Sequence, residues 1–276
     1  MRQHAVHFCQ IAICQVSFFV IVPAHRASAW STWRVHLKTT TTPSQRRPRG
    51  RPRTDESPAS LEVIFAAALK AFATHGYDGV SLRTLNRELG GSHNLLSGRF
   101  GSKEALWYAT VDWAFQPLVL RLATAFDPTV SDPVEQLRIT MRTFLLHMAQ
   151  RPELLGLMSI EGRQDTDRLS YVYNTYVQPA LEPVERLLDH LADSGRICRV
   201  PLRLFFFLLA HGAAALFTLA PLARHFDTAD PLAPACVESH ADLAADLLIR
   251  ALEIDSAAHG GDQGPANGRR RRGEVA

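Results

Sequence analysis

Residues 81–103 constrain the fold of this chain more tightly than any other segment. They contain two short stretches in which leucines recur at helical spacing, separated by the adjacent glycines Gly90 and Gly91. Ser81 and Ser92 stand at the starts of the two stretches, and serine is a favoured helix N-cap because its hydroxyl accepts a bond from a free backbone amide. The pattern predicts two short helices joined by a tight turn, which is a helix-turn-helix.

The second predicted helix has an apolar side and a polar side. Leu96 and Phe100 are four residues apart and should face a core, which leaves the polar side chains between them available for base edges in a DNA groove. Residues 58–76 have the apolar spacing of a supporting helix, and Ser102 is placed to cap a helix that starts at Lys103. Periodicity alone leaves one alternative open, a helical hairpin whose polar face is merely solvated.

The segment from Phe72 to Leu106 resembles the DNA-binding domain of TetR-family transcriptional regulators. The matching features are the Phe72/Gly76/Tyr77 end of the first helix, the helix-turn-helix of residues 81–100, and the sequence Phe100-x-Ser102-Lys103-Glu104-x-Leu106. The chain departs from the family at Ser97, where many members carry a tyrosine that touches the DNA backbone. It departs again at Leu95, which either touches a thymine methyl group or packs.

This resemblance implies an all-α fold, with an N-terminal three-helix DNA-binding domain at residues 57–106 and a larger helical domain at residues 107–256 for ligand binding and dimerisation. It also implies a homodimer that binds a double-stranded DNA operator. We expect base-edge contacts from Asn94 and His93. The other predicted DNA contacts, several of them to phosphates, are Ser81, Arg83, Thr84, Ser92, Leu95, Ser97, Arg99 and Lys103.

Positive charge is concentrated in the tails of the chain. Residues 1–56 hold nine Lys/Arg against two acidic residues, whereas residues 107–256 hold twelve against nineteen, so phosphate should repel the larger domain. Residues 46–53 have Pro-Arg-Gly-Arg-Pro at their centre and resemble an AT-hook, which predicts that Arg49 and Arg51 enter a narrow minor groove. The alternative is an arginine-rich linker that adds only nonspecific attraction.

The first 45 residues imitate a secretory signal, with Arg2, an apolar run and the small residues Ala27-Ser28-Ala29. The run contains polar residues and is shorter than a membrane span. We therefore expect residues 1–56 to be a disordered extension and the protein to be cytoplasmic. Four cysteines without zinc-site spacing agree with a reduced compartment and predict no metal or cofactor. The alternative is an all-helical small-molecule-binding protein, exported or tethered to the membrane through this segment.

Residues 107–256 show helical periodicity throughout, without the alternation typical of strands. Residues 201–219 are so apolar that they should be buried on several sides, and together with a last helix at residues 237–254 they have the character of the family's dimerising pair. The remaining residues, 257–276, are expected to be a disordered tail.

A ligand-responsive regulator requires a cavity in the larger domain, and the implied effector is small and largely apolar. The sequence contains none of the common hydrolase, nucleotide-binding or di-iron motifs, so no enzyme is expected. We expect a repressor that the effector releases from DNA. The residues predicted to line the cavity are Phe144, His147, Met148, Met158, Glu161, Tyr173, Tyr176, Phe206 and His211.

Overall fold

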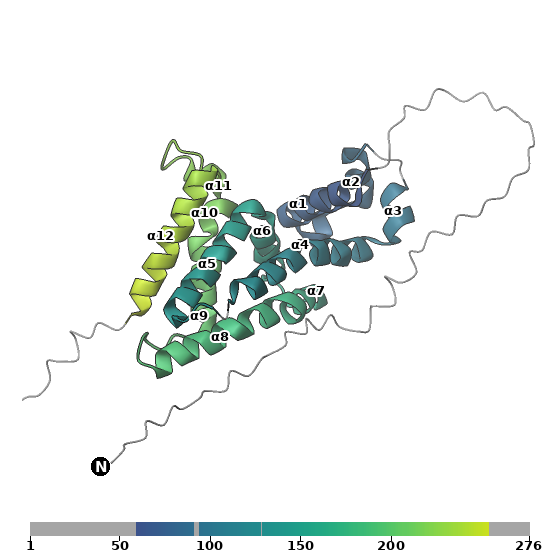
Figure 1. Ribbon diagram of the computed structural model, residues 1–276. Helices are drawn as coiled ribbons and strands as arrows, with labels where there is room; N and C mark the ends of the chain where they lie inside the picture. The colour runs from purple at the N-terminus through teal and green to yellow at the C-terminus, as the bar shows by residue number, and fades with distance from the viewer. Residues whose placement is uncertain (1–58, 91–93, 128, 254–276) are drawn as a thin grey trace, which may run out of the picture. The chain divides into compact units, whose positions relative to one another are not determined.

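The computed structural model describes residues 59–90, 94–127 and 129–253 (Figure 1). Within these ranges the regular structure is helical, apart from an isolated bridge between Ile197 and Glu253. The predicted N-terminal extension, its basic arm with Arg49 and Arg51, the C-terminal tail, and Ser92 and His93 lie outside the described residues. The all-α fold, with an N-terminal helix-turn-helix domain and a larger helical domain, is confirmed.

Three helices form the N-terminal domain: α1 (Leu61–Gly79), α2 (Leu82–Glu88) and α3 (Leu95–Phe100). Ser60 caps α1 by accepting a hydrogen bond from the amide of Val63. Regular helical geometry breaks at the predicted residue, Gly76, whose φ of +70° lies in the left-handed region that favours glycine. A Cβ at this position would also lie 3.1 Å from Cγ2 of Ile160 on another helix, so both backbone and packing require glycine here.

Two of the predicted helix N-caps differ from those in the structure. Ser81 is the N-cap of α2, but its side chain makes no capping hydrogen bond. Helix α3 begins at Leu95 after an Asn94 N-cap, later than the predicted start at Ser92. Ser102 does cap the next helix, because its Oγ accepts from the amide of Ala105 at 3.0 Å.

Eleven further helical segments of the described chain follow. They are α4 (Lys103–Ala125), α5 (Pro133–Gln150), α6 (Glu153–Glu161), α7 (Asp167–Val172), η2 (Tyr173–Val177), α8 (Gln178–Asp193), α9 (Leu202–Phe207), η3 (Leu208–Ala213), α10 (Ala215–Thr218), α11 (Ala220–Ala223) and α12 (Pro234–Leu252). Two of them, η2 and η3, are π-helical turns that continue their neighbouring α-helices. Such turns are rare and occur often at functional sites.

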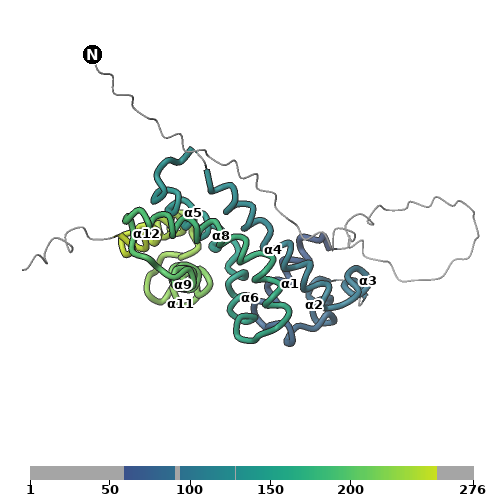
Figure 2. The backbone as a smooth tube through the Cα atoms, turned by 90° about the horizontal axis from the view of Figure 1, so that it is seen from below, coloured from purple at the N-terminus to yellow at the C-terminus, as the bar shows by residue number. Residues whose placement is uncertain are grey.

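The helices pack so that the N-terminal domain rests directly on the larger one. Helix α1 packs against both α6 and α4, α4 packs against α5, and α5 packs against α12 (Figures 1 and 2). Trp107 of α4 and Phe72 of α1 are among the largest fully buried side chains of the core that these helices share. No helix among the described residues is long and apolar enough to cross a membrane.

The apolar segment at residues 201–219 is not buried on several sides within one chain. Leu204, Phe207 and Leu208 are each about half exposed. The last helix, α12, also has both buried and exposed leucines: Leu252 is buried, whereas Leu243 and Leu247 are more than half exposed. These exposed leucines and phenylalanines leave an apolar surface on α9, η3 and α12.

Candidate DNA-binding surface and ligand cavity

Helices α2 and α3 each bury one leucine completely and turn most of their polar side chains outward. Leu85 of α2 is 1% exposed and Leu96 of α3 is completely buried. These two leucines fix the helices against the domain core, so the opposite faces point to solvent. The predicted DNA contacts that are exposed are Ser81, Arg83, Thr84, Asn94, Ser97 and Arg99, while Leu95 and Lys103 are partly buried.

Asn86 joins the two helices of the motif, and sequence reasoning missed it. Its side chain is 1% exposed, and its Oδ1 accepts a hydrogen bond from the backbone amide of Leu96 at 3.1 Å. An open hollow beside it is lined by Leu82, Arg83, Asn86 and Ser97. The available signal was a polar residue four positions after Leu82, on the stripe that otherwise carries leucines.

Lys103 and Arg99 already have partners within the protein. The ammonium of Lys103 donates to the carbonyl oxygens of Tyr77 at 3.0 Å and Val80 at 3.2 Å, and lies 4.3 Å from the centre of the Tyr77 ring. These contacts tie the end of α1 to the start of α4. Arg99 Nη1 donates to the carbonyl of Ala59 at 3.3 Å. Phosphate contact by either side chain stays a prediction, and for Lys103 it would use the remaining N–H.

A second cation on the Tyr77 ring comes from the larger domain. The guanidinium of Arg168, on α7, lies 4.0 Å from the ring centre. Its Nε donates to both carboxylate oxygens of Glu161, at 3.2 and 3.4 Å. Burial raises the pKa of the Tyr77 hydroxyl, and the negative charge of Glu104 adds to the shift. The two domains therefore meet through a buried carboxylate, a guanidinium and an aromatic ring.

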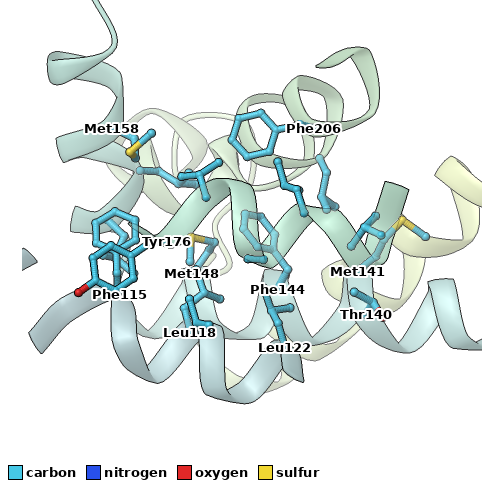
Figure 3. Close-up of a pocket in the computed structure, with 18 of the residues that line it drawn as sticks. Phe115, Leu118, Leu122, Thr140, Met141, Phe144, Met148, Met158, Tyr176 and Phe206 are labelled. Carbon is cyan, nitrogen blue, oxygen red and sulfur yellow. The ribbon is translucent and has the colours of Figure 1, made fainter. Parts of the chain in front are cut away.

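The larger domain contains a cavity of about 70 Å³ between α4, α5, α6, η2, α8, α9 and η3 (Figure 3). The wall is almost entirely hydrocarbon. It consists of Phe115, Leu118, Val119, Leu122, Leu137, Thr140, Met141, Phe144, Met148, Leu154, Leu155, Met158, Tyr176, Val177, Ala180, Leu181, Val184, Phe205, Phe206 and Leu209.

Both hydroxyl groups in the cavity wall donate to partners elsewhere in the protein. Thr140 Oγ1 donates to the carbonyl of Gln136 at 2.8 Å. The Tyr176 hydroxyl donates to Asp112 at 2.7 Å, and Tyr171 donates to the same carboxylate oxygen at 2.6 Å. Burial and the Asp112 carboxylate raise the pKa of Tyr176 far above its ordinary value, which keeps the hydroxyl protonated. The wall therefore suits an apolar molecule.

Five of the predicted lining residues are in this wall: Phe144, Met148, Met158, Tyr176 and Phe206. The other four do not line it. Glu161 pairs with Arg168, Tyr173 is half exposed, and His211 is exposed and stacks on Phe207 with ring centres 5.2 Å apart.

The fourth residue, His147, is buried outside the cavity wall. It is 2% exposed, and neither of its ring nitrogens has a hydrogen-bond partner. Burial lowers its pKa to about 4, and the positive charges of Arg121 and Arg151 contribute to this shift. His147 is therefore a neutral imidazole at pH 7.

Comparison with known proteins gives a family match for the N-terminal domain. Residues 64–109 match the family model described as "Bacterial regulatory proteins, tetR family". This range runs from α1 into α4 and so contains the whole helix-turn-helix. No curated protein matches the sequence.

Solved structures with a similar fold match nearly over their whole length. A TetR-family transcriptional regulator, PfmR, from Thermus thermophilus has 24% identity and a TM-score of 0.51 over 69% of this chain and 99% of its own. A putative fatty acid metabolism regulator from Clostridium perfringens has 19% identity and a TM-score of 0.55 over 70% and 99%. A tetR-family regulatory protein from Rhodococcus RHA1 has 17% identity and a TM-score of 0.51 over 72% and 100%. At these identities the likeness shows the fold alone.

Proposed function

We propose that this chain, whose residues 64–109 match the tetR family model, is a repressor that binds an operator as a homodimer and leaves it when a small apolar molecule binds. Members of this family are DNA-binding transcription factors and not enzymes. The observation that carries the proposal is the family match over a helix-turn-helix in which Leu85 and Leu96 are buried while Arg83, Thr84, Asn94, Ser97 and Arg99 are exposed.

The DNA contacts follow from that exposed face. Recognition helices present their N-terminal residues to base edges in the major groove, which gives this role to Asn94 and the preceding His93. We expect phosphate contacts from Arg83 and Thr84 on α2 and from Arg99 on α3, because all three side chains are exposed. The arm that carries Arg49 and Arg51 would add minor-groove contacts, since arginines gain from its negative potential.

Homodimer formation is supported by the apolar surface on α9, η3 and α12. Phe207, Leu208, Leu243 and Leu247 are each about half exposed or more, and large apolar side chains exposed on neighbouring helices are typical of an interaction surface. One recognition helix contacts too few base pairs for selectivity. A two-fold dimer places two of them about 34 Å apart, on successive turns of the major groove.

Release by a ligand is supported by the apolar cavity. A ligand shifts an equilibrium only through different affinities for the two states, so the effector must prefer a dimer whose recognition helices no longer match the operator. The wall offers no unpartnered hydroxyl, and a polar group buried there without a hydrogen bond would cost about 1–3 kcal/mol. The effector class is therefore a small molecule whose buried part is hydrocarbon.

The direct test starts from a randomised 30-base-pair duplex library, because the operator sequence is not known. The full-length protein should enrich a two-fold symmetric sequence. Fluorescence anisotropy should then show tighter binding to that duplex than to a scrambled one, with the preference surviving a salt series. Equal and steeply salt-sensitive binding to both duplexes would refute operator recognition and leave only nonspecific attraction by the arginine arm.

Sedimentation of the same protein should give a dimer, and Leu243→Asp together with Leu247→Asp should shift it toward monomer, because both leucines are exposed on one helix. The matched control is Glu238→Asp with Arg250→Lys, also exposed on α12, which keeps every charge. A wild-type monomer would exclude the homodimer.

A further inference from the structure

We propose that Asn86, on the neighbouring helix α2, supplies the N-terminal capping hydrogen bond of the recognition helix α3 and thereby leaves the Asn94 carboxamide free to read DNA. The DNA-reading half of this inference rests on the proposed function. The capping half concerns the free protein and can be tested without DNA.

The start of α3 needs a hydrogen-bond acceptor that its own N-cap does not supply. The first amides of any helix have no partner within the helix, and the N-cap side chain usually accepts from the second or third of them. Asn94 is the N-cap of α3, but its side chain makes no such bond. Its φ of −110° and ψ of 8° also differ from the extended conformation typical of a capping residue.

Asn86 supplies the missing acceptor. Leu96 is the second residue of α3, and its amide donates to Asn86 Oδ1 at 3.1 Å. This is the bond that a capping side chain would make, but here the acceptor is ten residues earlier in the sequence. Leu85 and Asn86 are both 1% exposed, so the acceptor is anchored in the domain core and holds α3 in a fixed position relative to α2.

The consequence lies at the exposed start of the recognition helix. Asn94 is exposed, at the position from which helix-turn-helix proteins contact base edges. A carboxamide that accepts from its own helix can no longer pair with both N6 and N7 of an adenine, which is the bidentate contact typical of asparagine. Capping from α2 removes this conflict, because the amide of Leu96 is satisfied by a residue that does not face the DNA.

The test uses Asn86→Ala, Asn86→Leu and Asn86→Asp in the full-length chain. Alanine and leucine remove the acceptor, whereas aspartate retains an acceptor oxygen close to a helix N-terminus, where negative charge is favourable. The matched control is Thr110→Val, which removes another buried side-chain hydrogen bond, that of Thr110 Oγ1 to the Leu106 carbonyl at 2.7 Å within α4. If Asn86→Leu fails to fold, Asn86→Asp and Asn86→Ala carry the comparison.

The first readout is amide hydrogen exchange in the free protein. Exchange at Leu96 should accelerate at least about fivefold in the alanine and leucine variants, less in the aspartate variant, and not in Thr110→Val beyond the change in global stability. Unchanged exchange at Leu96 in Asn86→Ala would overturn the capping assignment.

The second readout is the ratio of affinities for the library-enriched duplex and its scrambled counterpart. Asn86→Ala should lower this ratio about fivefold or more, the size of one impaired base contact. Asn86→Asp should recover most of it, and Thr110→Val should leave it unchanged. In an Asn94→Ala background, Asn86→Ala should lower the ratio much less, because the contact that it impairs is already absent.

Additive effects of the two substitutions would overturn the link between Asn86 and Asn94. If the wild-type chain enriches no duplex, the proposed function fails, and the exchange at Leu96 still decides the capping half.

Discussion

Replacing Arg168 by methionine should destabilise the fold much more than the loss of a surface ion pair, because it leaves a buried carboxylate without a partner. The Glu161 side chain is 5% exposed and the Arg168 side chain is 21% exposed. The same guanidinium lies over the Tyr77 ring at 4.0 Å and within 6.0 Å of the centre of the Trp107 ring. Arg168 therefore contributes an ion pair and a cation–π contact at the point where the two domains meet.

The expected magnitude lies between two limits. Loss of one partner costs about 3–5 kcal/mol in a fully buried pair and about 0–1 kcal/mol in an exposed one. The guanidinium retains contact with water, so we take about 2 kcal/mol for the ion pair, and the cation–π contact adds about 0.5–1 kcal/mol. Arg168→Met should thus lower the free energy of unfolding by about 2–3 kcal/mol.

A double-mutant cycle separates the pair from the individual side chains. Glu161→Gln alone should cost about 1–2 kcal/mol, and the double variant should cost about 1–2 kcal/mol less than the sum of the two, because it contains no unpaired buried charge. The measurement is urea unfolding followed by far-ultraviolet circular dichroism at pH 7. The protein concentration is held fixed because association contributes to apparent stability.

The control for this cycle is Arg186→Met. It removes an exposed pair with Glu182, in which both side chains keep more than half of their surface, so the change should stay below about 1 kcal/mol. A loss in Arg168→Met no larger than this control, or strict additivity with Glu161→Gln, would refute the reasoning about the buried pair.

Three further predictions concern the cavity, a buried histidine and a glycine. Met148→Trp should fill the apolar cavity and abolish the binding of a small apolar probe such as benzene, measured by calorimetric titration, while operator affinity changes less than threefold; unchanged benzene binding would place the site elsewhere. Because the pKa of His147 falls to about 4 in the fold, stability should be fully present above about pH 6.5 and should decline as pH falls toward 4, by up to about 3 kcal/mol. Urea midpoints of His147→Phe across that range should vary less than those of wild type, and an identical pH dependence would contradict the assignment. Gly76→Ala should lower the free energy of unfolding by about 1–2 kcal/mol, because a φ of +70° disfavours a side chain and a Cβ would crowd Ile160. The control is Gly98→Ala, where a Cβ meets open space and φ is not positive. A change in thermal midpoint no larger than that of the control would show that neither constraint operates.

The sequence predicted the features that depend on local chemistry. The break at Gly76, the cap at Ser102 and the helix at residues 133–150 all follow from single-residue conformational preferences and apolar spacing. Assignment to a family came from a motif with fixed spacing, which depends on no knowledge of tertiary contacts.

Features that depend on tertiary partners were not predictable in this way. Lys103 looks like a phosphate-binding residue in the sequence, because its carbonyl partners are more than twenty residues away. In the sequence, Asn86 only interrupts a stripe of leucines, because its partner, the amide of Leu96, is on another helix. The apolar spacing of a helix such as α5 indicates which residues are buried, but not which of them border the cavity. His147 and Met148 are adjacent on α5, yet only the methionine lines the wall.

The domains share an apolar core and are also joined by a cluster of charged and aromatic side chains. Leu85 and Leu96 are packed in a close-fitting apolar core, where small displacements lose contacts steeply. At the junction, Arg168 lies over Tyr77 in a cation–π contact beside the apolar packing of α1 on α6. Helix α7, which carries Arg168, continues directly into η2, which carries the cavity residue Tyr176. If the proposed function holds, a ligand-driven population shift would change the contacts at this junction while each helix-turn-helix stays intact.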